Sequence, residues 1–290
     1  MKKILLMLSL FSHLFVKAQE KVNPVSFQAG FTTSTTATYH IIDNDTSFKN
    51  TFTIAPFLRI MHRSGFGLNY SLSGIASDSG NNIFMHTASA FYEEYDKPVN
   101  LNFRYTHFFF TNNNAVPYTP ISNEIYGYVA YKKLWLAPVM AASFGFGQDE
   151  NKQQQSGLNV AAGFTHNFNF SNKTLQADIA PSVFINAGND MFYSFVRTAR
   201  YNTQGNGSKN FLKNQSHGRG NSNRGNGTTV TTSTVNNQFT FNNAELNVYS
   251  SFTIGHFEIV PDMSVYVPLN TNNDFSFYWQ LKLGYNVGKL

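Results

Sequence analysis

The sequence predicts an all-β protein, a single antiparallel up-and-down transmembrane β-barrel of about 12 strands with short periplasmic turns and longer extracellular loops. Three observations lead to this fold class. The chain has an N-terminal export signal, its strand-length segments alternate apolar and polar side chains, and no apolar run approaches the roughly 20 residues of a membrane-spanning helix. Aromatic residues make up 16% of the chain and charged residues only 13%, whereas about 25% is usual in a soluble domain.

Residues 1–18 have the organisation of a secretory signal peptide. Lys2 and Lys3 precede an apolar run, and small or medium-sized residues follow where signal peptidase would cut, before Gln19. The predicted barrel occupies residues 19–290, which suffice for one domain. Removing the three lysines of the signal from 21 basic residues leaves 18 against 16 acidic ones. The remaining positive charge is small, and no nucleic-acid-binding motif is present.

The last predicted strand, Phe275 to Val287, shows the alternation most clearly. Its odd-numbered side chains are apolar and include Trp279, while its even-numbered side chains are largely polar and include Lys282. Because successive side chains of a strand point to opposite faces, one face is continuously apolar and the other is polar. In a membrane barrel the apolar face contacts lipid and the polar face lines the lumen.

Further segments repeat this pattern and complete an even number of strands. Tight turns alternate with longer polar connections, and both termini fall on the side of the tight turns, as in bacterial single-chain barrels. The segment 83–95 fits least well, since neither of its parities is cleanly apolar. The predicted strands are 24–39, 48–61, 66–75, 83–95, 99–110, 121–131, 134–146, 158–170, 175–187, 239–254, 257–267 and 275–287.

Four prolines, Pro56, Pro138, Pro181 and Pro261, each stand inside a predicted strand on its apolar side. Proline lacks the N–H that a ladder hydrogen bond needs, so a paired strand tolerates it at a bulge or a bend. We therefore expect repeated bends in the barrel wall. Chance recurrence of short apolar words is the alternative.

The longest connection, residues 188–237, is the one predicted element outside the barrel wall. Its middle, residues 205–227, consists mainly of Gly, Asn, Ser, Lys and Arg, which bury too little apolar surface to order the segment. We expect a mobile extracellular loop whose cations attract lipopolysaccharide, anionic solutes or a partner, and a solvated spacer is the alternative. The basic candidates of this loop are Arg197, Arg200, Lys209, Lys213, Arg219 and Arg224.

The sequence predicts no enzyme. It holds no cysteine, which excludes disulfides and thiolate chemistry. It also has no phosphate loop, dinucleotide fingerprint or zinc motif, so neither a cofactor nor a metal site is predicted. Some outer-membrane lipid hydrolases place a His and a Ser two residues apart on one strand face, but no Ser follows His86, His107, His166 or His256 at that spacing. His107 and His166 stand on apolar parities, where an interfacial position explains them.

Charged and amide side chains occupy the inward parity of the predicted strands. In a sealed apolar core each would cost several kcal/mol, so they imply either water or mutual pairing inside the barrel. Inward aromatic residues, among them Phe57, Phe108 and Trp135, indicate a constricted lumen or a partly apolar ligand passage. The lumen-lining candidates are Arg59, Arg104, Asp178, Glu245, Glu258, Asp262 and Lys282.

Over its full mature length the chain resembles the broad class of Gram-negative outer-membrane β-barrel proteins, through the export signal, the alternating strands and the aromatic last strand. Many members end in an aromatic residue that the barrel-assembly machinery recognises, whereas this chain ends in Gly288, Lys289 and Leu290. The resemblance implies an outer-membrane location, with outer-membrane lipid, lipopolysaccharide and the assembly machinery as partners. The oligomeric state stays open.

The expected function is a narrow passive channel for small polar solutes. The alternative is a non-conducting structural or surface barrel whose extracellular loops bind a partner or lipopolysaccharide. A soluble β-sandwich or jelly roll is also compatible with alternating strands. Its strands, however, seldom place so many aromatic residues on an outward face.

Overall fold

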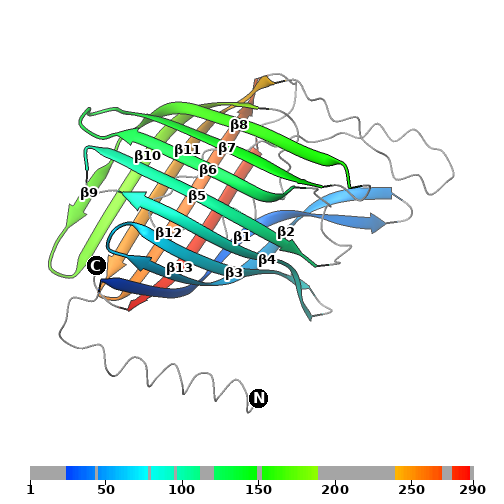
Figure 1. The fold of residues 1–290 in the computed structure, drawn as a ribbon, viewed down its shortest axis with the longest axis horizontal. Coiled ribbons are helices and arrows are strands. Elements are labelled where there is room, and N and C mark those ends of the chain that lie inside the picture. Colours follow the sequence, from blue (N-terminus) through cyan, green and yellow to red (C-terminus); the bar gives the residue numbers. More distant parts are fainter. Residues whose placement is uncertain are drawn as a thin grey trace, which may run out of the picture.

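The computed structural model is a closed β-barrel (Figure 1). It describes residues 24–42, 45–77, 80–94, 97–111, 121–148, 152–188, 239–269 and 276–287. Twelve antiparallel strands follow one another in sequence order around the wall, and the last pairs with the first to close it. No helix within these ranges is long and apolar enough to cross a membrane. The predicted all-β, up-and-down barrel is thus confirmed.

The strand bounds agree with most of the predicted segments to within a few residues. The strands are β1 (Val25–Ile42), β2 (Asp45–His62), β3 (Phe66–Ser77), β4 (Gly80–Glu94), β5 (Val99–Phe110), β6 (Ile121–Tyr131), β7 (Ala137–Gln148), β8 (Gln154–Thr165), β9 (Phe168–Ser171), β10 (Leu175–Gly188), β11 (Thr240–Ile254), β12 (Phe257–Pro268) and β13 (Ser276–Val287).

Two predicted strands are wrong at the periplasmic side of the wall. The seventh starts at Ala137 and not at residue 134, because the preceding residues form the turn from β6. Trp135, predicted to face inward, lies in this turn and is 77% exposed. The predicted eighth strand, 158–170, is divided into β8 and the short β9, which pairs with β10. β9 therefore continues the pairing with β10 beyond the end of β8, next to the turn that leads into β10.

The ambiguous parity of the fourth predicted segment has a structural cause. The pairing of β3 with β4 shifts register between Ser73 and Gly74. Opposite this irregularity, the consecutive residues Phe84 and Met85 are both buried. A bulge lets two successive side chains share one face, so strict alternation is lost there.

The prolines interrupt pairing without shifting register. Pro56 on the β3 side and Pro261 on the β11 side fall in gaps between paired residues, while pairing resumes in the same register beyond them. Pro181 is paired with Val248 of β11 and stands next to the end of β8 pairing. The register shifts among the described strands lie elsewhere, at Asn186/Ala187, Ser73/Gly74 and Ile121/Asn123, and the bends expected at the prolines stay a prediction. Each proline leaves a ladder bond unmade.

The outer face of the barrel is apolar. Leu68 and Met140 are 61% and 63% exposed, and similar large apolar side chains cover the outside of the other strands. Aromatic rings meet near strand ends, as in the pairs Phe257–Tyr285, with centroids 5.1 Å apart, and Phe66–Tyr92, with centroids 4.9 Å apart. An exposed apolar band flanked by aromatic rings is the surface that a membrane barrel presents to lipid.

Several predictions fall outside the described residues. These are the signal peptide and nearly all of the long loop, with its basic candidates Arg197, Arg200, Lys209, Lys213, Arg219 and Arg224.

Candidate functional site

A row of polar side chains crosses the inner face at the periplasmic end of β1, β2 and β3. Arg59 stands opposite Gln28 on one side and Asn69 on the other. All three side chains are buried. Since directly opposed residues share a face of the sheet, the register alone brings these groups together inside the barrel.

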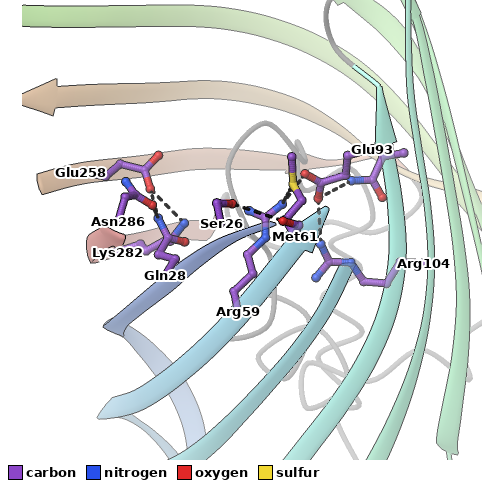
Figure 2. A network of polar contacts seen from close by, with 10 residues as sticks. Ser26, Gln28, Arg59, Met61, Glu93, Arg104, Glu258, Lys282 and Asn286 are labelled. Carbon is purple, nitrogen blue, oxygen red and sulfur yellow. Dashed lines mark hydrogen bonds and ion pairs between the residues drawn. The ribbon is translucent and has the colours of Figure 1, made fainter. Parts of the chain in front are cut away.

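Glu93 of β4 joins two arginines from different strands (Figure 2). Its Oε2 lies 2.5 Å from Arg59 Nη2, and its Oε1 lies 3.2 Å from Arg104 Nη2. Asn102 Nδ2 also donates to Oε1, at 3.1 Å. Both guanidinium groups face the Phe91 ring, with Cζ 4.5 Å and 5.2 Å from its centroid, respectively. The carboxylate and the ring together compensate two cations that are withdrawn from water.

A second ion pair occupies β12, β13 and β1. Lys282 Nζ lies 3.3 Å from Glu258 Oε2. Gln28 Nε2 donates to the same carboxylate oxygen at 2.5 Å and to Asn286 Oδ1 at 2.9 Å. The Phe57 ring lies beneath the ammonium group, with its centroid 5.3 Å from Nζ. This pair repeats the design of the first, a buried cation between a carboxylate and an aromatic face.

The two groups form one charged network. Gln28, which contacts Glu258, is directly opposite Arg59 in the sheet. The charged network, defined by Arg59, Glu93, Arg104, Glu258 and Lys282, therefore extends from β12 through β13, β1, β2 and β4 to β5 (Figure 2).

Further carboxylates lie nearer the extracellular ends of the strands. Glu245 accepts hydrogen bonds from Ser264 Oγ at 2.9 Å and Tyr266 Oη at 3.1 Å. Asp262 accepts one from Asn247 Nδ2 at 2.6 Å. Glu124 accepts one from Ser143. Hydroxyl and amide donors thus solvate these carboxylates in place of water.

Most of the lumen-lining candidates are buried inside the barrel. Asp178 differs: it is partly exposed at the periplasmic end of β10, opposite Asn169 of β9. Sequence reasoning missed Glu93 and Glu124. Glu93 lies in the segment of ambiguous parity. Glu124 has the same parity as Tyr126 and Tyr128, and these aromatic residues made the inward face of the strand difficult to recognise from the sequence. The candidates buried inside are Arg59, Arg104, Glu245, Glu258, Asp262 and Lys282.

The rest of the interior is filled by packed side chains. Tyr126 and Tyr128 of β6 and Phe184 of β10 pack against small residues of β7 and β8, Ala141 and Ala161. A separate apolar cluster fills the wall of β3 to β6 near the extracellular ends; its members are Ile75, Phe84, Met85, Phe108 and Ile121. Packed side chains therefore fill part of the interior on the β6 to β8 side and near the extracellular ends of β3 to β6.

Nothing in the described ranges provides a metal centre, since no three His, Asp or Glu side chains gather at a spacing that would hold a metal ion.

The wall of the barrel is closed, so the backbone groups of its strands pair with one another and not with lipid. Its outside is apolar and its inside is charged and hydrogen-bonded, as in membrane-spanning barrels. The protein is a membrane-spanning β-barrel of the outer-membrane class. No family model and no curated protein matches the sequence.

Solved structures with a similar fold include an outer membrane channel from Pseudomonas putida F1, with 10% identity, 92% of this chain and 96% of that chain covered, and a TM-score of 0.46. The NanC porin has 8% identity, 92% and 100% coverage and a TM-score of 0.39. LpxR from Salmonella typhimurium has 8% identity, 90% and 99% coverage and a TM-score of 0.40. At this level the likenesses say nothing about what this chain does.

Proposed function

We propose that the protein is an outer-membrane barrel that passes small polar solutes through a narrow lumen, with the charged network as its constriction. The observation that carries this proposal is that, among the described residues, eight charged side chains are buried inside an apolar-coated barrel. Well-packed apolar residues would fill the same space at lower cost, because burying an ion pair rarely gains stability. Charges retained in the lumen instead offer partners to polar solutes and water. We assign no catalytic role to the barrel.

The network also suggests how passage would occur. Arg59, Glu93 and Arg104 are 6%, 4% and 1% exposed, so a solute has to displace some of their contacts. The side chains are long and come from different strands, which lets them separate without breaking the barrel wall. We therefore expect low conductance with frequent closures.

Single-channel recording of the purified protein in planar bilayers tests this function. Stepwise conductance is expected, and replacing Lys282 with Met should change its size or ion preference. The matched control is Lys97→Met, which removes a cation from the turn between β4 and β5, outside the lumen. A folded barrel that stays silent would contradict the channel. Heat-modifiable electrophoretic mobility confirms folding in each sample.

A second candidate is a non-conducting barrel that binds a partner or lipopolysaccharide through its extracellular loops. The observation that favours it is that the charged side chains buried among the described residues have low solvent exposure, 6% or less. Deleting residues 205–227 should then abolish binding to the partner or to vesicles that contain lipopolysaccharide and leave folding intact. Unchanged binding after the deletion would refute this candidate.

A further inference from the structure

Three polar side chains lie in one row across β1, β2 and β3 on the inner face of the barrel. Arg59 stands opposite Gln28 on one side and Asn69 on the other, and the exposed fractions of these side chains are 6%, 7% and 5%. We call the three residues the polar row. Each has one buried side-chain atom without a hydrogen-bond partner in the described part of the chain: Gln28 Oε1, Arg59 Nε and Asn69 Nδ2. The polar row thus leaves one acceptor and two donors unused.

Unused groups of this kind are uncommon in a protein interior. Nearly all buried donors and acceptors of folded proteins are hydrogen-bonded, because a buried group without a partner has lost its water and gained nothing in return. Directly opposed residues of a sheet have neighbouring side chains, so one small molecule can contact all three members of the polar row. Their arrangement therefore indicates a ligand as the missing partner.

The contacts that Arg59 does make leave its charge incompletely compensated. Its Nη2 donates to Glu93 Oε2 at 2.5 Å and to Met61 Sδ at 3.3 Å, and a thioether sulfur is only a weak acceptor. Glu93 also pairs with Arg104, so one carboxylate serves two guanidinium groups. Among the described residues of β1 to β5, these are the charged side chains that are buried, two positive and one negative. An anionic acceptor at Arg59 would balance them.

The polar row lies one step inside the periplasmic rim of the barrel. Each of its members is three positions from the periplasmic end of its strand. The next row towards the rim, Ser26, Met61 and Gly67, is only half-buried. The Phe91 ring packs over Gly67, where a Cβ atom would collide with it. Met61 contacts Arg59 next to this ring (Figure 2), and its unbranched side chain adapts easily to a neighbour. A small solute therefore reaches Arg59 from the periplasm when Met61 moves aside.

The unused groups define the chemistry of the ligand. A carboxylate accepts hydrogen bonds from two donors at once and is a preferred partner of a guanidinium group, so Arg59 Nε and Asn69 Nδ2 suit one carboxylate. Gln28 Oε1 only accepts, and it requires a donor on the ligand. Neighbouring strands are about 4.8 Å apart, which places that donor within a few bonds of the carboxylate. A hydroxyl group on the adjacent carbon meets this requirement.

We propose that the polar row binds a small hydroxycarboxylate, whose carboxylate accepts hydrogen bonds from Arg59 and Asn69 and whose hydroxyl donates to Gln28. The site includes one residue of the charged network, but a solute that enters from the periplasm does not have to cross the lumen to reach it. The inference is therefore independent of conduction and of the long extracellular loop.

Titration of the full-length barrel in detergent micelles with lactate, followed by ligand-observed NMR, tests the proposal. Lactate should bind saturably. Lactamide, which keeps the hydroxyl and lacks the charge, should bind on the order of tenfold more weakly, because hydrogen bonds to a charged group are the stronger ones. Propionate, which lacks the hydroxyl, should also bind more weakly than lactate. Absence of lactate binding, or equal binding by either of the other two compounds, would overturn the proposal.

Variants at Asn69 locate the binding. Asn69→Asp introduces a carboxylate opposite Arg59, where the ligand carboxylate is expected, and should abolish lactate binding. Asn69→Ala removes one donor without adding charge and should weaken binding on the order of tenfold. The matched control is Asn100→Asp, the same change on the inward parity of β5 outside the polar row, and it should bind lactate as the wild type does. Heat-modifiable electrophoretic mobility confirms folding of each variant. Wild-type lactate affinity in the folded Asn69 variants would refute the site.

Single-channel recording of the same samples separates this site from the proposed channel. A silent barrel that binds lactate would contradict the channel and support the site. A conducting barrel that does not bind lactate would support the channel and contradict the site. Deletion of residues 205–227 should leave lactate binding unchanged, since the polar row lies at the opposite, periplasmic end of the barrel.

Discussion

The two sides of the barrel interior are filled in different ways. From β12 through β13 and β1 to β5, buried ion pairs occupy the lumen, with Glu93 between Arg59 and Arg104 at their centre. On β6, β7 and β8, large rings pack over small residues, as Tyr128 does over Ala141. The first side depends on the balance of charges and the second on complementary volumes. They should therefore fail under different substitutions.

The largest effect is expected from Glu93→Gln. This change keeps the shape of the side chain but leaves two buried guanidinium groups without their carboxylate, which costs about 3–5 kcal/mol when a buried pair is broken. Urea-induced unfolding in detergent micelles, followed by tryptophan fluorescence, measures the loss. The neighbouring Glu94→Gln is the control, since Glu94 pairs with the exposed Lys97 outside the lumen. Equal stability of the two variants would mean that the charged network contributes nothing to the fold.

A smaller effect is expected from Ala141→Leu on the other side. The added atoms have to displace Tyr128 or a neighbouring ring, and overpacking of this kind costs about 1–3 kcal/mol. The same unfolding experiment applies. Ala142→Leu is the control, because Ala142 is exposed on the outside of the same strand, where a larger apolar side chain contacts lipid. If Ala141→Leu were as stable as this control, the interior would hold unfilled space at Tyr128.

The hydrogen-bonded wall on the charged side gives a third, weaker test. Ser71 Oγ and Thr87 Oγ1 are 2.6 Å apart and buried. Ser71→Ala should cost about 1 kcal/mol, and the double variant with Thr87→Ala should cost less than the sum of the two single ones, because no group is then left unpaired. A double-mutant cycle on unfolding free energies checks this. Strict additivity would show that the two hydroxyls do not interact.

The smallest effect is expected at Lys97, outside the interior altogether. The hydrogen bond to Glu94, with N and O 2.9 Å apart, and the charge of that carboxylate raise the pKa of Lys97. A raised lysine pKa favours the folded state at neutral pH, and this contribution disappears once the pH rises above the pKa of the folded form. Solvent screens an exposed pair, so Lys97→Ala should leave the urea midpoint unchanged at pH 7. A clear shift of the urea midpoint would show that this turn contributes to the stability of the barrel.

The alternation of side chains determined the barrel by itself. Segments such as 99–110 and 275–287 separate apolar from polar residues at a period of two, and together with the predicted export signal that pattern indicates a closed wall in lipid. The burial of Arg59, Arg104 and Lys282 on the inward face followed from parity alone. These features are local, since each strand carries its own two faces.

Tertiary structure decided which charges meet and where the pattern breaks. The partnership of Glu93 with Arg59 and Arg104 joins β4 with β2 and β5, so it depends on strand register, which a slip of one residue would reverse. The bulge at Phe84 of β4 and the division of β8 from β9 likewise depend on neighbouring strands. The outward turn position of Trp135 depends on where pairing with β6 ends. The sequence of a single strand does not specify which residues of the neighbouring strands will pair with it. The interior network depends on that pairing, so only the tertiary structure shows it.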